Sequence, residues 1–97
     1  MSAYILVEIS AVKDADGFNA YREKAPETVA KFGGQYEVVG GDAAVLEGDW
    51  KPGTVVLLKF PDRERAESWW KSTDYRPLKE QRQQASESTF VLLNSLA

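Results

Sequence analysis

The sequence contains no cysteine and no histidine among its 97 residues. Without cysteine there is no disulfide, no thiolate nucleophile and no cysteine ligand for an iron–sulfur cluster. Without histidine there is no Ser-His-Asp or Cys-His catalytic arrangement, no axial histidine for haem and no histidine-bound zinc. Acid–base chemistry must come from aspartate, glutamate, tyrosine, lysine or a bound cofactor, and nothing in the sequence indicates a cofactor or a metal site.

The chain also lacks an excess of basic residues and a long hydrophobic run. The chain has 12 basic and 15 acidic residues, which gives a net charge of −3. This balance argues against nucleic-acid binding, which requires a basic surface. No apolar run is long enough to span a bilayer, and the start of the chain has no basic segment followed by an apolar stretch. We therefore expect a cytoplasmic protein that binds neither nucleic acid nor membranes.

The length and composition are those of one globular domain. Apolar residues make up 43% of the chain and charged residues 28%, which is ordinary for a folded protein. Ninety-seven residues suffice for a single hydrophobic core of limited size. We therefore expect one domain over residues 1–97.

Apolar runs separated by turn residues predict a sheet of four strands. The third run is the clearest, because four consecutive apolar residues at 55–58 indicate a strand covered on both faces, and Pro61 ends it. The expected strands cover residues 3–10, 35–39, 54–60 and 88–94, with an irregular continuation over 43–47 after a turn at Gly40-Gly41-Asp42.

Helical periodicity occupies the segment between the first two strands. Its apolar stripe consists of Phe18, Tyr21, Ala25, Val29 and Phe32. Asp14 or Asp16 can cap the start of this helix, and Gly33-Gly34 can supply the left-handed conformation that ends it. Pro26 removes one backbone donor in between. The pattern predicts a helix that is kinked at Pro26 or divided there into two short helices.

Two helical segments are expected between the last two strands. The first covers residues 63–71 after Asp62, a good N-cap, and Trp69 is expected to face the core more directly than Trp70. Ser72-Thr73-Asp74 interrupts the helix and caps the next one. On that second helix one arc at 100° per residue contains Tyr75, Leu78, Arg82 and Ala85.

The order of the elements is β-α-β-β-α-β. This is the ferredoxin-like arrangement of the α+β class, in which the helices of two crossovers cover one face of an antiparallel sheet. The first, third and fourth strands are expected to be apolar on both faces, yet the crossovers cover only one. A second copy, placed sheet against sheet, is the simplest cover for the other face, so we expect a homodimer.

Arg82 lies near the middle of the inward arc and has two interpretations. A guanidinium keeps its charge, so it needs partners when it leaves water. In the architectural interpretation its stem packs against apolar residues while its head reaches solvent or pairs with a carboxylate such as Glu47 or Asp49. In the functional interpretation its fork of donors binds an anionic group of a ligand.

A series of residues over nearly the whole chain has the spacing of a known family. The series is Gly33-Gly34-x-Tyr36, Gly40-Gly41, Leu46-Glu47-Gly48-Asp49-Trp50, Phe60-Pro61, Ala66, Trp69, Ser72, Tyr75 and Arg82. It resembles the domain of unknown function 1330 family, within the dimeric α/β-barrel superfamily. The resemblance implies the ferredoxin-like fold and the sheet-to-sheet dimer, and it carries no established activity. Val39 departs from the pattern, because the family commonly has a basic residue there, so an anion site using that position would lack one charge.

Three functional hypotheses follow, and the sequence does not decide whether the protein is an enzyme. In the first, a pocket between sheet and helices binds a small aromatic or acidic metabolite through Arg82, Tyr75, Trp69, Trp50 and Tyr21. In the second, the protein is a cofactor-free monooxygenase or an isomerase, activities that occur in the superfamily. An isomerase would need a base, for which Glu47 and Asp49 are the loop candidates. In the third, it is a non-catalytic dimeric interaction module.

Overall fold

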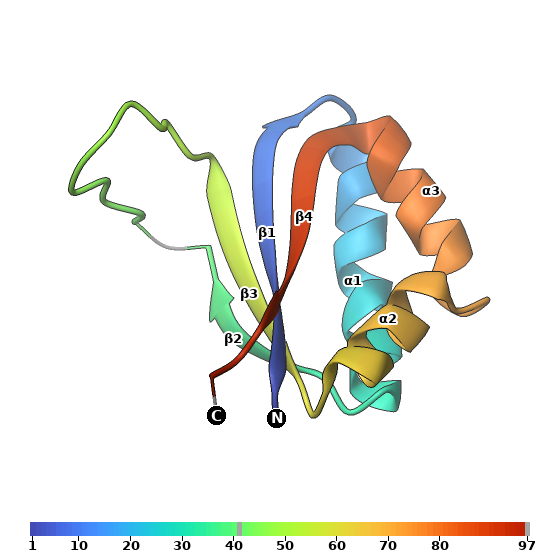
Figure 1. Cartoon of the computed structure of the whole chain (residues 1–97). Helices are drawn as coiled ribbons and strands as arrows, with labels where there is room; N and C mark the ends of the chain where they lie inside the picture. Colours follow the sequence, from blue (N-terminus) through green and yellow to red (C-terminus); the bar gives the residue numbers. More distant parts are fainter. Residues whose placement is uncertain (41, 97) are drawn as a thin grey trace.

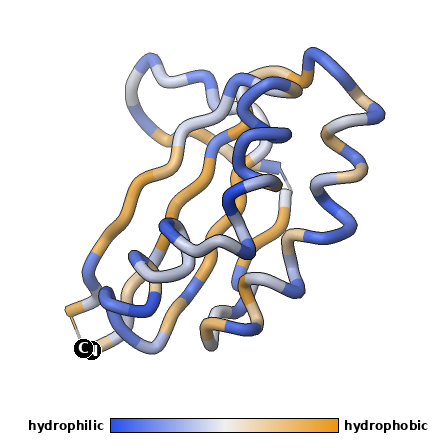
Figure 2. Tube along the Cα trace, turned by 90° about the vertical axis from the view of Figure 1, so that its right-hand side faces the viewer, coloured by the Kyte–Doolittle hydropathy of each residue, from blue (hydrophilic) through white to orange (hydrophobic). Residues whose placement is uncertain are grey.

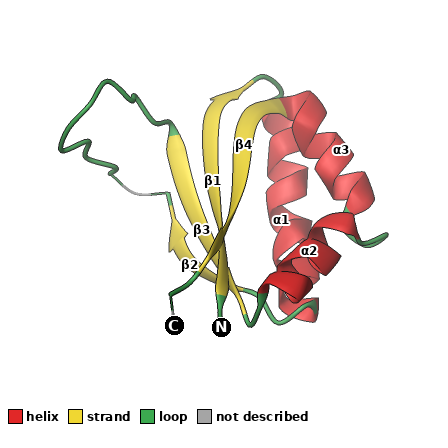
Figure 3. Ribbon diagram, in the orientation of Figure 1, coloured by secondary structure: helices red, strands yellow, loops and turns green. Residues whose placement is uncertain are grey.

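The computed structural model describes residues 1–40 and 42–96. These residues form, in order, β1 (Ala3–Val12), α1 (Ala15–Lys31), β2 (Gln35–Val39), β3 (Thr54–Phe60), α2 (Arg63–Lys71), α3 (Arg76–Ala85) and β4 (Ser86–Asn94). The strands make one antiparallel sheet in the spatial order β2-β3-β1-β4, and all the helices lie on one side of it (Figures 1 and 3). This is the predicted ferredoxin-like α+β fold, with its second crossover divided into α2 and α3.

The core lies between the sheet and the helices. Alternate residues of β1 face the helices, and Ala3, Ile5 and Val7 are buried there. Ala3 is paired with Phe60, and Ile5 with Leu58, so neighbouring strands present their apolar side chains to the same layer. Figure 2 shows this hydrophobic colour along the strands, with hydrophilic colour alternating along the helices in front.

Helix α1 is positioned by its two ends. The Asp14 carboxylate accepts a hydrogen bond from the Gly17 amide at 3.2 Å, and Gly33 follows the helix with a φ of 80°. Both features were predicted. The helix continues through Pro26, so its predicted division into two helices is wrong. Pro26 lies on the exposed side of α1, where water can satisfy the carbonyl that loses its helical donor.

The connection between β2 and β3 contains no strand in its described part, so the irregular strand predicted over residues 43–47 is wrong. The last residue pair of the β2–β3 hairpin is Val39 with Val56, and the apolar side chains of Val45 and Leu46 are exposed beyond it. Figure 1 shows this loop extending away from the sheet. The predicted turn at Gly40-Gly41-Asp42 includes Gly41, which lies outside the described residues.

The face of the sheet away from the helices is rich in apolar side chains. Leu6 lies on this face between Leu57 of β3 and Val91 of β4, the residues with which it is paired. Val91 and Leu93 are 41% and 44% exposed. No helix covers this side in Figure 3. The two-faced apolar character predicted for the long strands is therefore present, and within the described chain one face remains open to solvent.

Candidate ligand-binding cavity between the sheet and the helices

A cavity of about 630 Å³ lies between helix α1 and the helix-facing side of the sheet. Its wall is mainly apolar, with Val7, Val56 and Leu58 on the strand side. Side chains with polar groups come from several elements. They are Asn19, Tyr21 and Arg22 of α1, Tyr36 of β2, Thr54 of β3, Trp69 of α2 and Arg82 of α3.

Arg82 is the buried charge of this cavity. It is only 3% exposed, and its Nε donates to the Tyr75 hydroxyl at 3.4 Å. Its Cζ lies 4.1 Å from the centre of the Phe90 ring and 5.9 Å from those of Tyr21 and Trp70. Within residues 1–40 and 42–96, no carboxylate is close enough to form an ion pair with it. Aromatic faces therefore surround a guanidinium that has no anionic partner in this part of the chain.

Two tyrosines connect Arg82 to the cavity wall. The Tyr21 and Tyr75 hydroxyl oxygens are 2.7 Å apart and buried. The Tyr75 ring lies 4.1 Å, centre to centre, from the ring of Trp69. The Trp69 Nε1 in turn donates to the Thr28 hydroxyl at 3.0 Å, which ties α2 to α1. The rings at this end of the cavity are thus held in place by contacts on several sides.

Burial keeps both hydroxyls protonated. It is the main cause that raises the pKa of Tyr21, and the neighbouring Tyr75 raises that pKa further. Burial also raises the pKa of Tyr75, against the opposing influence of Arg82 and of the Tyr21 hydrogen bond. At neutral pH these side chains therefore donate and accept hydrogen bonds as neutral phenols, and neither acts as a base.

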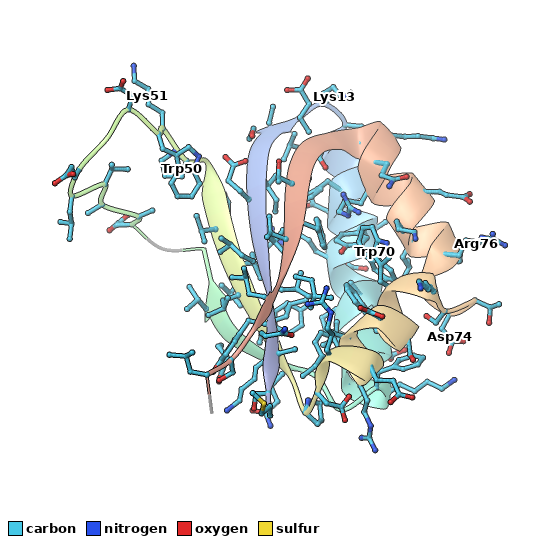
Figure 4. All side chains as sticks on the ribbon, viewed as in Figure 1. Lys13, Trp50, Lys51, Trp70, Asp74 and Arg76 are labelled. Carbon is cyan, nitrogen blue, oxygen red and sulfur yellow. The ribbon has the colours of Figure 1, made fainter. Side chains whose placement is uncertain are left out.

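The structure brings four of the predicted site residues together and leaves three apart. Tyr21, Trp69 and Arg82 line the cavity, and the buried Tyr75 contacts all three of them. Glu47, Asp49 and Trp50 lie on the exposed loop outside the cavity, and Trp50 is 56% exposed. Figure 4 shows Trp50 beside β3, far from Trp70 among the helices. The predicted pairing of Arg82 with Glu47 or Asp49 is absent from the described part of the chain.

Sequence reasoning missed other residues of the wall. Tyr36 is paired with Leu58, so strand alternation could have placed it toward the helices. Phe90 is paired with Val7 and shares its face for the same reason. Asn19 and Arg22 have no such signal, because they lie beside the apolar stripe of α1 and not on it.

Two further observations on the described residues concern a metal-binding cluster and a membrane-spanning helix. Residues 1–40 and 42–96 hold no group of three or more acidic side chains arranged to bind a metal ion. In the same residues, no helix has both the length and the hydrophobicity needed to cross a bilayer.

The fold and the cavity define a small ferredoxin-like protein in which a buried arginine lines an apolar pocket and has no carboxylate partner among residues 1–40 and 42–96. The chain belongs to the family described as domain of unknown function (DUF1330), whose model matches residues 2–96. No curated protein matches it.

Similar solved structures share this fold at low sequence identity. A protein of unknown function from Rhodopseudomonas palustris is 17% identical with a TM-score of 0.77, over 99% of this chain and 83% of its own. SnoaB, a cofactor-independent oxygenase from Streptomyces nogalater, is 10% identical with a TM-score of 0.64, over 99% and 94%. A dimeric protein of unknown function with a ferredoxin-like fold from Bacteroides fragilis is 11% identical with a TM-score of 0.54, over 97% and 96%.

Proposed function

We propose that the protein binds a small, largely apolar or aromatic molecule with one anionic group in the cavity between sheet and helices. The observation that carries this proposal is the burial of Arg82 without a carboxylate partner in the described residues. A guanidinium keeps its charge in any environment, and a buried charge is costly unless it is paired. An anionic ligand group supplies the missing partner.

The hydrogen-bonding capacity of Arg82 supports the same proposal. A guanidinium has five N–H bonds, and Arg82 uses the one on Nε with Tyr75. Within the described residues, its two Nη atoms have no hydrogen-bond acceptor. In the same residues, every side-chain nitrogen that is fully buried has a hydrogen-bond partner, so the Nη atoms are not fully buried. The Nη groups therefore reach accessible space and can donate in pairs to a carboxylate or to a single oxyanion. A volume of about 630 Å³ accommodates a molecule of one to three rings.

Calorimetric titration with small aromatic carboxylates and their methyl esters tests this proposal. We expect the acid to bind at least about tenfold more tightly than its ester, equivalent to about 1.4 kcal/mol. Arg82→Met should abolish this preference. Arg76→Met is the matched control, because Arg76 lies on the same helix with its side chain directed into solvent (Figure 4). Equal binding of acid and ester, or an equal loss in both variants, would contradict the proposal.

A cofactor-free oxygenase is a second candidate, supported by an apolar cavity next to neutral tyrosines and a cation. In such a reaction an activated CH₂ group and O₂ would yield a carbonyl group and water, so one O₂ is consumed for each substrate. An oxygen electrode with electron-rich hydroxyaromatic compounds measures this ratio. The isomerase alternative has less support, since within the described residues no carboxylate lines the cavity.

We also propose that the protein is a homodimer joined through the open face of the sheet. The exposed apolar residues of that face support this assembly, and one protein of similar fold is described as dimeric. The Trp50 loop lies on the same side of the molecule and can contribute to the contact (Figure 4). In the remaining alternative, the loop and this face bind another protein and the cavity has no ligand.

A further inference from the structure

Arg82, Tyr75 and Tyr21 form a continuous row of hydrogen-bonding groups. The Nε–H of Arg82 is only a donor, so the Tyr75 oxygen accepts at that bond. An oxygen that accepts from a cation becomes a stronger donor through its own hydrogen. Either hydroxyl can be the donor across the 2.7 Å contact between their oxygens, and this polarisation favours Tyr75 as the donor to Tyr21.

With Tyr75 as the donor, the hydrogen of the Tyr21 hydroxyl is left for a third group. No further acceptor for it lies among the described residues, since its one hydrogen bond there is the contact with Tyr75. Tyr21 itself lines the cavity. The chain Arg82–Tyr75–Tyr21 thus ends in an O–H donor at the cavity wall, backed by a positive charge.

The groups that face this donor are positive or neutral on every element around it. Helix α3 contributes Arg82, and Tyr75 comes directly before that helix. Helix α1 adds Arg22 at the rim, and β2 contributes Tyr36. The wall residues of β1, β3, β4 and α2 are uncharged. No described residue on the wall can therefore take a proton from a ligand, whereas a negative oxygen formed on the ligand is stabilised.

We propose that the cavity recognises a phenolic or enolic hydroxyl and binds it as its oxyanion, with the Tyr21 hydroxyl and the Arg82 guanidinium as donors to that oxygen. This inference rests on the proposed ligand-binding function and narrows it to weakly acidic hydroxyl compounds. The ligand O–H bond breaks, its electron pair stays on the oxygen, and the proton is released to water or buffer. The protein then lowers the pKa of the bound hydroxyl relative to the free compound.

Spectroscopic titration of 4-nitrophenol tests this inference, because its phenolate and phenol forms have different absorption spectra. At saturating protein we expect the pKa of the bound compound to fall by about one unit or more, which is a tenfold preference for the anion. The methyl ether 4-nitroanisole cannot ionise, and it should bind at least about tenfold more weakly at a pH where the bound phenol is ionised.

Variants assign this shift to the named residues. Tyr21→Phe, which keeps the ring, should remove a large part of the pKa shift, and Arg82→Met should remove nearly all of it. Arg76→Met should leave the shift unchanged. Circular dichroism shows whether each variant is folded, and the comparison of 4-nitrophenol with 4-nitroanisole on the unaltered protein stands even if Tyr21→Phe does not fold.

The outcomes separate this inference from the function on which it rests. A lowered pKa that depends on Tyr21 and Arg82 supports the oxyanion site. Binding of aromatic carboxylates combined with an unshifted or raised pKa of 4-nitrophenol, or with no binding of it, overturns the oxyanion site and leaves the anion-binding cavity. Failure of both classes of compound to bind overturns both proposals.

Discussion

Arg82 shows how a single charged residue can be held inside an apolar layer. The Phe90 ring lies beneath its guanidinium, and the rings of Tyr21 and Trp70 are further away. Each such cation–π contact contributes about 0.5–2 kcal/mol, with the larger values for desolvated pairs. These contacts partly offset the cost of removing the charge from water. They contact the faces of the guanidinium, so the N–H groups of its two Nη atoms, which point outward in its plane, are not blocked by the rings.

Replacing Arg82 by methionine tests whether the arginine serves architecture or binding. Methionine keeps an unbranched apolar chain of similar reach, and within the described residues it removes a buried charge without leaving a paired carboxylate stranded. We therefore expect an unchanged or higher free energy of unfolding in urea, together with the loss of anion binding. A destabilisation of about 3 kcal/mol or more would assign Arg82 to the architecture, since most substitutions cost about 0.5–3 kcal/mol and larger losses have a specific structural cause.

The tyrosine pair predicts a stability loss in alkali. Burial raises the pKa of Tyr21 and Tyr75 in the folded protein above the value of about 10 in the unfolded chain. The unfolded chain therefore loses these protons first, and the folded state loses stability as the pH rises above about 10. Below that pH the contribution is complete. In urea unfolding at pH 8 and pH 11, the variant carrying both Tyr21→Phe and Tyr75→Phe should lose less stability than the unaltered protein, and an equal loss would contradict this assignment.

At the scale of elements, helix α2 matters chiefly through one tryptophan. Trp69 is 1% exposed, and its ring lies 5.6 Å from that of Phe60 and 4.1 Å from that of Tyr75. Trp70 is only partly buried and has the Lys79 ammonium 4.3 Å above its ring. The two neighbouring residues therefore have unequal roles, as helical phase predicted.

Truncation of each tryptophan measures this inequality. Trp69→Ala should lower the free energy of unfolding by about 3–5 kcal/mol, because it opens a cavity among fixed rings and leaves the Thr28 hydroxyl without its donor. Trp70→Ala should cost clearly less, since part of that side chain already faces solvent. Urea unfolding of both variants measures the two losses of unfolding free energy. Equal losses would contradict the conclusion that Trp69 contributes more to stability than Trp70.

The predictions from the sequence were correct where the residues of one segment determine the structure, and they were wrong where contacts between segments determine it. Strands 35–39 and 54–60 and helix 63–71 were predicted with the observed bounds, because apolar runs, Pro61 and Asp62 mark them directly. Val45 and Leu46 have apolar side chains typical of a strand, so the sequence predicted one there. The strand pairing ends before these residues, at Val39, and both are exposed. The predicted division of the first helix at Pro26 was wrong, because Pro26 lies on the exposed side of α1, and the sequence alone did not establish that side.

The residues of the candidate site were likewise predicted correctly where helical periodicity places them, and not elsewhere. Helical phase was enough to bring Tyr75 and Arg82 to one interior surface, and it placed Tyr21 and Trp69 in the same layer. Glu47, Asp49 and Trp50 lie in a loop without helical or strand periodicity, so the sequence pattern could not show where their side chains point. Their predicted position at the pocket was based only on their proximity to the strands in the chain. The opposition of α1 and β2 that completes the cavity is a tertiary arrangement, and no single segment encodes it.

At the scale of the whole molecule, the open sheet face is the surface through which we propose that two copies assemble. Leu6, Leu57 and Val91 form a row across three strands at its centre. A sheet-to-sheet homodimer would bury on the order of 2,000 Å² in total, the size of a stable interface. The helices face away from this contact, so each protomer keeps its own cavity accessible.

A charge at the centre of this row should prevent assembly. We expect light scattering to show a dimer for the unaltered protein at micromolar concentration and a monomer for Leu6→Lys. Glu80→Lys, on the exposed side of α3, is the matched control and should remain dimeric. A monomeric unaltered protein, or a Leu6→Lys variant that stays dimeric, would exclude this face as the interface.

The two ends of the described chain meet, with consequences for its connectivity. The Ser95 amide donates to the Ser2 carbonyl at 2.9 Å, and Figure 1 places both termini at the end of the sheet opposite the β2–β3 loop. A short linker could therefore join the ends while the exposed loop is opened. The permuted chain would start at β3 and end at β2, and its elements would again read β-α-β-β-α-β. The molecule is thus two β-α-β halves whose order along the gene can be exchanged without changing a single strand pairing.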